Sequence, residues 1–289
     1  MHSMNTADYE ADDWLDLAWS PWRSLDPAAG ELTAITTEPG LYRVRHHNRE
    51  GLTYIGQTGR DLRERLRALA GCYNEEMPYT DPHVTAPCLW AIRQESGPAF
   101  EVSVATPDGV GDNQRRKGIE EALIAVYRRE TGSNTEANFG RMIEGYKRSS
   151  RSSDGVVGGP LEDDQTEPNT AAGIGPLPWE NHSNPTASEW MGLEWSPLQT
   201  LAQADQSIPQ AAGVYRIWDP SEPHPLEYIG QSTRLRNRLY RHRRTRSEEL
   251  HFSYATHSVA DAKHILEQIE TDLIGAHWLA LDMAPRDQF

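Results

Sequence analysis

Hydrophobic residues along this chain repeat one succession of patterns in its two halves. Short runs of apolar and β-forming residues occupy 40–44 and 52–56, and runs of the same kind occupy 213–217 and 226–230. A polar turn separates the two members of each pair, so the pattern predicts an antiparallel hairpin at the start of each half. Leucines at helical spacing follow over 62–69 and 235–239, which predicts a helix after each hairpin.

A third strand and a second helix complete each half. The strands are expected at 100–104 and 250–254, and the helices at 119–129 and 260–277. The element order is therefore ββαβα, twice. This order predicts the α/β class in its α+β form, with two copies of a small domain that each hold a three-stranded antiparallel sheet flanked by helices.

The two copies are expected at 1–146 and 188–289. Residues 147–187 between them are rich in Gly, Ser, Pro and acidic residues, a composition typical of a flexible linker. A tryptophan motif precedes each hairpin, because Trp19-Ser20-Pro21 matches Trp195-Ser196-Pro197. Serine followed by proline is typical of a helix N-cap and first turn, and the tryptophans are expected to anchor the core.

Composition limits where the protein acts. Of its 289 residues 37% are hydrophobic, enough for two modest cores. No apolar run approaches the length of a membrane span, and the first residues are acidic where a secretory signal would be basic. A cytoplasmic protein with no membrane partner is therefore expected. Cys72 and Cys88, the only cysteines, are expected to be buried thiols rather than a disulfide or a metal site.

The charge balance limits how the protein could bind nucleic acid. Acidic residues outnumber basic ones by 43 to 28, which gives a net charge of −15 and argues against nonspecific coating of a polyanion. A nucleic-acid site would then be a local basic surface. Residues 234–246, RLRNRLYRHRRTR, contain seven Arg, one His and no acid. A solvated charged helix is the other interpretation of this segment.

Tyrosine and glycine motifs occupy the two strands of each predicted hairpin. The first copy has GLY at 40–42 and YIG at 54–56, and the second has GVY at 213–215 and YIG at 228–230. A Leu-x-x-Arg-Leu helix follows each hairpin and carries Arg65 or Arg238. In the last helix of each copy, Glu120 or Glu270 stands three residues before a Leu-Ile pair. This ordered set resembles the GIY-YIG nuclease superfamily, in two tandem copies.

The resemblance implies a hydrolase, a GIY-YIG-type phosphodiesterase that acts as a metal-dependent DNA endonuclease. The first tyrosine of each copy would help to activate the attacking water, and the second would position water or phosphate. Glu120 and Glu270 would hold Mg²⁺ or Mn²⁺, one ion per active copy. The implied catalytic residues are Tyr42, Tyr54, Arg65, Glu120, Tyr215, Tyr228, Arg238, His242 and Glu270.

The chemistry of these side chains is compatible with that role. Arginine presents a planar fork suited to a phosphate. Each glutamate lies on or beside the inward stripe of its helix, where a carboxylate costs free energy unless it has a partner. A hard divalent cation is one such partner, and a buried ion pair with Arg is another. Surface salt bridges and ordinary strand packing remain the alternatives for the arginines and tyrosines.

The copies depart from the family pattern in two places. Many members carry a histidine four residues after the helix arginine; the second copy has His242 there, whereas the first has Leu69, which leaves open whether it lacks that base or phosphate contact. His83, in a stretch found only in the first copy, could face the site, although a role in stabilising its loop is the stronger expectation. After the glutamate helix the family places an Asn, for which the second copy offers only Asp287 or Gln288. Residues expected to contact duplex DNA are Arg63, Asn134, Asn138, Arg234, Arg236 and Arg241.

Three functions remain compatible with the sequence. The chain could be an endonuclease with two active sites, or one catalytic copy joined to a copy that only grips DNA. It could also be a non-catalytic DNA-binding protein on a nuclease fold. Both halves keep the two tyrosines, the arginine and the glutamate, which favours an enzyme acting in restriction, defence or repair.

Overall fold

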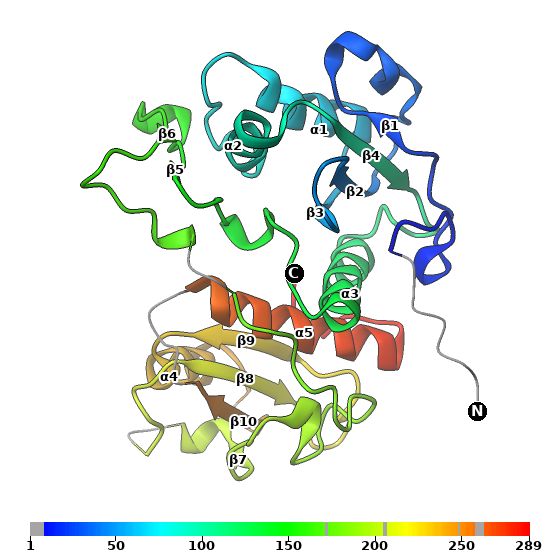
Figure 1. Cartoon of the computed structure of the whole chain (residues 1–289). Coiled ribbons are helices and arrows are strands. Elements are labelled where there is room, and N and C mark those ends of the chain that lie inside the picture. Colours follow the sequence, from blue (N-terminus) through cyan, green and yellow to red (C-terminus); the bar gives the residue numbers. More distant parts are fainter. Residues whose placement is uncertain (1–8, 171–172, 205–206, 248, 258–262) are drawn as a thin grey trace. The chain divides into compact units, whose positions relative to one another are not determined.

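The computed structural model describes residues 9–170, 173–204, 207–247, 249–257 and 263–289 (Figure 1). The chain divides into two compact units. The first unit comprises residues 1–116 and 134–172, and the second comprises 117–133 and 173–289. The predicted domain limits at 1–146, 147–187 and 188–289 stay a prediction.

Each unit is built on a four-stranded antiparallel sheet. The first sheet has the order β1 (Arg23–Ser24), β4 (Phe100–Ala105), β2 (Gly40–His46), β3 (Leu52–Thr58). The second has the order β7 (Gln199–Thr200), β10 (His251–Thr256), β8 (Gly213–Trp218), β9 (Tyr228–Ser232). The mixed architecture with antiparallel sheets confirms the α+β class. The predicted three-stranded sheet is wrong, because a short edge strand, β1 or β7, adds a fourth strand to each sheet.

Five α-helices occur in the described residues: α1 (Leu62–Leu69), α2 (Ala86–Ser96), α3 (Asn113–Thr131), α4 (Leu235–Thr245) and α5 (Lys263–Leu281). The helix α2 has no counterpart in the predicted pattern. Residues 258–262, where one predicted helix begins, lie outside the described residues. A small two-stranded sheet pairs β5 (Tyr146–Lys147) with β6 (Gly159–Pro160). Short 3₁₀ turns occupy Trp14–Asp16, Pro27–Ala29, Glu31–Ala34, Ala70–Tyr73, Asn138–Gly140, Ser152–Asp154, Pro168–Thr170, Trp190–Gly192 and Leu201–Gln203.

Apolar faces of helices and sheets form the cores. In the first unit α1 packs against β2 and β3, and in the second α4 and α5 pack against β8 and β9. Leucines of α1 and α4 are buried at the predicted helical spacing, and so are both cysteines, which are free thiols. Among the described residues, no helix combines the length and the apolar character that crossing a membrane requires.

The Ser-Pro pairs do not start helices, contrary to the prediction. Ser20 donates its backbone N–H to the carbonyl of Val104 (2.8 Å), and its hydroxyl accepts the N–H of Val104 (3.0 Å). Ser196 makes the same two bonds with Tyr254, at 2.7 and 3.1 Å. A serine hydroxyl can replace a backbone acceptor in this way, so each serine extends the sheet ladder just before β1 or β7.

Tryptophans cover the arginine that follows the first tyrosine of each hairpin. The Arg43 guanidinium lies 4.3 Å from the centre of a Trp19 ring, and that of Arg216 lies 4.1 Å from a Trp195 ring. Both arginines are fully buried. Trp14, Trp19 and Trp190 are buried too, which confirms that these tryptophans anchor the core. Because neighbouring residues on a strand point to opposite faces, this packing fixes β2 and β8 from the side away from the tyrosine.

Parts of 147–187, the predicted linker, bond to one unit or the other. In the first unit the Asp81 carboxylate accepts the backbone N–H and the hydroxyl of Ser152. In the second unit, Ile174 and Leu177 donate their backbone N–H groups to side chains of α5. The predicted flexibility of the linker as a whole stays a prediction.

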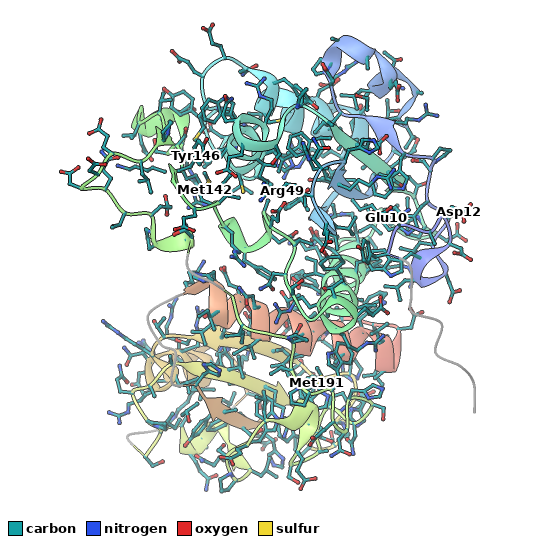
Figure 2. All side chains as sticks on the ribbon, viewed as in Figure 1. Glu10, Asp12, Arg49, Met142, Tyr146 and Met191 are labelled. Carbon is teal, nitrogen blue, oxygen red and sulfur yellow. The ribbon has the colours of Figure 1, made fainter. Side chains whose placement is uncertain are left out.

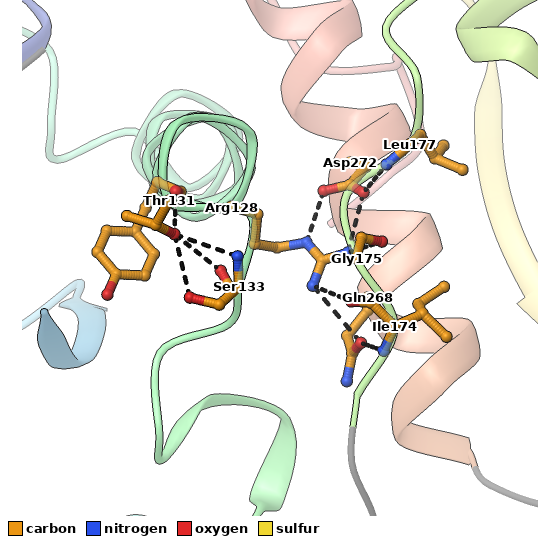
Figure 3. A network of polar contacts seen from close by, with 9 residues as sticks. Arg128, Thr131, Ser133, Ile174, Gly175, Leu177, Gln268 and Asp272 are labelled. Carbon is orange, nitrogen blue, oxygen red and sulfur yellow. Dashed lines mark hydrogen bonds and ion pairs between the residues drawn. The ribbon is translucent and has the colours of Figure 1, made fainter. Parts of the chain in front are cut away.

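The part of α3 from residue 117 onward packs against α5 inside the second unit. Arg128 forms a bidentate ion pair with Asp272, with Nε–Oδ1 at 2.7 Å and Nη2–Oδ2 at 3.1 Å (Figure 3). Both side chains are 0% exposed. The helices approach closely at Gly275, where an added Cβ would stand 2.4 Å from the Cβ of Ala125. Glycine is therefore required at this crossing.

The contacts of α3 with α5 follow a two-fold pattern. Gly118 contacts the Trp278 ring, and Arg128 contacts Gln268. Position 118 plus 150 is 268, and position 128 plus 150 is 278. The two contacts therefore join equivalent positions of the two helices, with the helices exchanged. Glu121 bonds to Thr271 and Ala125 meets Gly275, and the same shift maps each of these pairs onto itself. Such self-complementary contacts are typical of an isologous interface.

Candidate active site

The first tyrosine of each hairpin lies directly over the glycine of YIG. Tyr42 on β2 is paired in register with Gly56 on β3, and Tyr215 on β8 with Gly230 on β9. A Cβ added at Gly56 would stand 2.7 Å from the Tyr42 hydroxyl oxygen, and one at Gly230 would stand 2.4 Å from that of Tyr215. Real Cβ atoms do not approach an oxygen so closely, so glycine is required for the position of each hydroxyl.

Each inner tyrosine forms an aromatic cluster with the tyrosine of YIG and a histidine. In the first unit the ring centres of Tyr42 and Tyr54 are 5.9 Å apart, and His83 lies 6.1 and 5.8 Å from them. In the second unit Tyr215 and Tyr228 are 6.0 Å apart, and His242 lies 5.3 and 5.1 Å from them. We call these two groups the first and second tyrosine clusters.

In the first cluster, two side-chain nitrogens lie near the Tyr42 hydroxyl oxygen. His83 Nε2 lies 2.8 Å from that oxygen, and Arg65 Nε lies 3.4 Å from it. Arg65 also donates from Nη1 to the carbonyl of Pro82 (2.9 Å), next to His83. Tyr42 and His83 are both 0% exposed. The segment between α1 and α2 therefore brings its histidine into contact with the predicted tyrosine and arginine.

In the second cluster, the histidine comes from the helix. His242 Nε2 lies 2.8 Å from the Tyr215 hydroxyl, and Arg246 Nε donates to His242 Nδ1 at 3.0 Å. Burial and three neighbouring arginines, Arg246 first among them, lower the pKa of His242 to about 4. The imidazole is therefore neutral at neutral pH. Leu69, the first-unit residue four positions after Arg65, is instead buried in the core.

The tyrosines of the second cluster are protonated in the ground state. Burial raises the pKa of Tyr215, and burial together with the Glu270 carboxylate raises the pKa of Tyr228. Arg238 acts in the opposite direction on both hydroxyls. A phenolate at this site would therefore depend on added positive charge.

Glu270 on α5 stands beside the second cluster. Its pKa is raised to about 8, chiefly by burial and then by the carboxylates of Glu121 and Glu267, while Arg238 and the backbone N–H of Gln231 lower it. Gln231 directly follows Gly230 in β9. Glu120, the predicted counterpart, is half-buried on α3 in the part of that helix that belongs to the second unit. The first unit thus holds Tyr42, Tyr54 and Arg65, and the second holds both glutamates.

The donors fit a cation held by few protein ligands. Within the described part of the chain, no three His, Cys, Asp or Glu side chains come together as a ready metal cage. Mg²⁺ commonly uses one or two carboxylates and completes its shell with waters and substrate phosphate oxygens, so a cage is not required. Glu270 is a carboxylate whose charged form is disfavoured by burial and by neighbouring acids, and a bound cation would reverse that preference.

Three of the predicted DNA contacts, Asn138, Arg63 and Arg236, bond to backbone groups within the protein. Asn138 Oδ1 accepts the N–H of Ile55 (2.9 Å), and its Nδ2 donates to the carbonyl of Ile55 (2.8 Å), so this side chain clamps β3. Arg63 and Arg236 donate Nε to the carbonyls of Ile35 and Ile208. Asn134 lines a pocket of about 410 Å³. Arg49 and Met142, which also line it, are labelled in Figure 2.

Gln288 makes in the second unit a contact like one that Asn138 makes in the first. Its Oε1 accepts the N–H of Ile229 at 3.0 Å, the bond that Asn138 makes to Ile55 in the first unit. Of the two substitutes proposed from sequence, Gln288 therefore takes the strand-clamping position. Asp287 instead pairs with Arg246.

The outer face of α4 carries the cations that stay accessible. Side chains exposed along this face are Arg234, Asn237, Tyr240, Arg241 and Arg244. We call this set the α4 stripe; it contains no acid. The exposed helix residues of α1 are Glu64 and Arg67, which form an ion pair. Among the residues that the structure describes, the arginines of the α4 stripe have no ion pair, whereas Arg67 of α1 is paired with Glu64. The phosphates of a DNA strand would therefore meet more uncompensated positive charge on α4 than on α1.

Two contributors differ from the stronger sequence expectations. Loop stabilisation was the stronger expectation for His83, which instead contacts the Tyr42 hydroxyl. Arg246, at the end of the helix that carries His242, had no predicted part in the site. Only the i, i+4 spacing from His242 to Arg246 could have indicated their contact.

Three comparisons with known proteins, against family models, curated proteins and solved structures, found no match. Function is therefore inferred from the two clusters and their surroundings.

Proposed function

We propose that this chain is a DNA endonuclease of the GIY-YIG type, with two tandem copies of the ββαβα domain and catalysis in at least one. The observation that carries the proposal is the recurrence of one chemical group in both units. An inner tyrosine over a glycine, an outer tyrosine, a histidine and a helix arginine meet in each. A carboxylate, Glu270, stands beside the second cluster.

Each residue has a part that its position supports. Arg65 and Arg238 would bind a phosphate oxygen through the guanidinium fork. Tyr215 and Tyr42 would orient the attacking water and accept its proton, with Tyr228 and Tyr54 as outer partners. Mg²⁺ or Mn²⁺, when bound at Glu270 or Glu120, would supply the positive charge that favours a phenolate and neutralises the phosphate. The α4 stripe would hold the DNA backbone beside the second cluster.

Retention of the whole set argues against the non-catalytic alternative. A protein that only grips DNA gains nothing from a half-buried acid near the polyanion, since the neutral acid does not attract phosphate and its ionised form repels it. The proposed setting is the cytoplasm, and restriction, defence or repair are the proposed roles.

Cleavage of supercoiled plasmid tests the proposal. The wild type is compared with Glu120→Ala, Glu270→Ala and the double variant, in Mg²⁺ or Mn²⁺. Linear product from the wild type, nicked circles from each single variant and uncut plasmid with the double variant are expected if both copies cut. If one single variant cuts like the wild type and the other leaves the plasmid uncut, only one copy is catalytic and the other only binds DNA. If the wild type binds DNA but never cuts it, the proposed nuclease activity is wrong and the non-catalytic DNA-binding function remains.

A further inference from the structure

We propose that His83 is a positioning residue of the first tyrosine cluster and that it donates its Nε2–H to the Tyr42 hydroxyl, as His242 does to Tyr215. The catalytic consequence rests on the proposed function, whereas the direction of the hydrogen bond rests on geometry alone. The loop between α1 and α2 would thus supply the histidine that α1 lacks.

The direction of the bond follows from what meets the other ring nitrogen. In the first unit the backbone N–H of Thr85 donates to His83 Nδ1 at 3.2 Å. In the second, the guanidinium of Arg246 donates Nε–H to His242 Nδ1 at 3.0 Å. An amide and a guanidinium carry their protons at all relevant pH values, so Nδ1 must accept in both rings. In a neutral imidazole the proton then lies on Nε2, the atom 2.8 Å from each tyrosine oxygen.

Burial keeps both rings neutral. Burial lowers the pKa of His83 well below its ordinary value, and the Arg65 guanidinium lowers it further. The groups that face His83 from neighbouring elements are Arg65 on α1, Tyr42 on β2 and Tyr54 on β3. A second proton would place two positive charges side by side in a buried site, which is unfavourable.

A donor on this side of the hydroxyl fixes where the tyrosine proton can go. Because the Tyr42 oxygen accepts from His83, its own proton points away from the imidazole. In the second cluster Tyr215 bonds onward to the Tyr228 hydroxyl. The histidine therefore is not the base that takes the tyrosine proton. It would stabilise the phenolate that is left when a solvent base takes that proton from the side away from the imidazole.

The loop that carries His83 is held in place from several sides. The Pro82 carbonyl accepts from Arg65, the Asp81 carboxylate binds Ser152, and the Thr80 N–H donates to the carbonyl of Ser150 at 3.0 Å. Preorganised donors are the ones that contribute to catalysis. These anchors explain how a loop can present a histidine as firmly as a helix does.

Replacing His83 by glutamine distinguishes a histidine that donates a hydrogen bond from one that acts as a base. Glutamine keeps an N–H that can reach the hydroxyl and cannot carry a proton to or from it. In a Glu270→Ala background, which isolates the first cluster, His83→Gln should retain plasmid nicking within about 10-fold, and His83→Ala should lose about 100-fold. His242→Gln and His242→Ala in a Glu120→Ala background provide the matched pair, and thermal melts verify folding. Equal loss with Gln and Ala would make the histidine a proton carrier, and no loss with either would make it structural; both outcomes overturn the proposal.

A long-range ¹H–¹⁵N spectrum of the full chain at neutral pH tests the same bond without any cleavage. The expected pattern for both histidines is a protonated Nε2 and an unprotonated Nδ1, with His83→Gln used to assign the first. A protonated Nδ1 or an imidazolium overturns the proposal. Should no variant cut DNA, the proposed function fails, and this spectrum still decides the hydrogen bond.

Discussion

The two tyrosine clusters share one central contact, between a tyrosine hydroxyl and a histidine, and differ in the residues that surround it. In both, a tyrosine hydroxyl over a glycine meets a histidine nitrogen at 2.8 Å. In the first the histidine is fully buried and comes from a loop, whereas in the second it is half-buried and stands on α4. The chemistry of the centre is thus kept while the chain segment that supplies one member changes.

The exposed helix surfaces of the two units, on α1 and α4, differ in how much positive charge they present to a polyanion. The first unit presents Glu64 paired with Arg67 along its helix, and the second presents the acid-free α4 stripe. On the proposed function, the two clusters would be chemically similar, and the α4 stripe would be the main DNA-binding surface. Four measurements would break or sharpen it.

The largest effect is expected from Asp272→Ala, which removes the buried ion-pair partner of Arg128 between α5 and α3. Arg128 would keep its charge at 0% exposure without its carboxylate partner. Loss of one partner from a buried ion pair costs about 3–5 kcal/mol in the free energy of unfolding. Urea unfolding measures it, and Glu64→Ala, in an exposed pair, is the control with an expected cost below about 1 kcal/mol. A cost for Asp272→Ala as small as the control's would contradict the role of this pair.

Acid should weaken the second unit through His277. Its Nε2 accepts the N–H of Leu226 (3.0 Å), just before β9, and its pKa is lowered to about 4, chiefly by burial. The unfolded chain takes up a proton near the ordinary value, so the stabilisation is present above about pH 6.5 and is lost as the pH falls towards 4. The loss is at most about 3 kcal/mol.

The measurement is the free energy of unfolding of the wild type and His277→Gln between pH 7 and 4.5. The difference between the two should shrink as the pH falls, because only the wild type pays this protonation penalty. Curves that stay parallel would show that His277 does not titrate in this way.

Alanine at either YIG glycine should displace the inner tyrosine. Gly56→Ala and Gly230→Ala each place a Cβ against a tyrosine ring and hydroxyl, and such overpacking costs about 1–3 kcal/mol. Cleavage by the affected cluster should fall by about 100-fold, since its hydroxyl moves. Gly111→Ala, where an added Cβ meets nothing within 4 Å, is the control. If only one of the two variants loses activity, the clusters are not equivalent.

The smallest effect concerns the grip on DNA. Arg241→Ala with Arg244→Ala should weaken binding several-fold and reduce the slope of log affinity against log salt by about one per lost phosphate contact. Arg60→Ala with Arg67→Ala is the matched pair on the first unit. Equal losses from the two pairs would remove the asymmetry between α4 and α1.

Sequence periodicity predicted the paired strands and the helices α1, α3, α4 and α5, because each has one apolar face or a buried run. It did not predict α2, since residues 86–92 are buried on every side and the segment shows no helical period. The Ser-Pro interpretation was wrong because a serine hydroxyl can serve a sheet ladder as well as a helix start.

For the site, the motifs predicted the tyrosines, Arg65, Arg238, His242 and Glu270, whose positions follow from regular elements. They left His83 open between facing the site and stabilising its loop, because a loop's path depends on distant anchors such as Ser152. They also assigned Asn138 to DNA, whereas both its amide atoms bond to Ile55. A polar side chain in a motif can be kept for the strand it holds rather than for a ligand.

The two-fold contact pattern of α3 with α5 has an evolutionary consequence. In a dimer of identical chains every substitution at such an interface appears twice, so a residue must suit both of its symmetry-related environments. On the proposed duplication, joining the halves in one chain removes that constraint. The equivalent positions 128 and 278 could then hold different residues, Arg128 and Trp278. The equivalent positions 122 and 272 could likewise hold Ala122 and Asp272, and only Asp272 pairs with an arginine, Arg128. Fusion would thus allow the two halves to specialise separately.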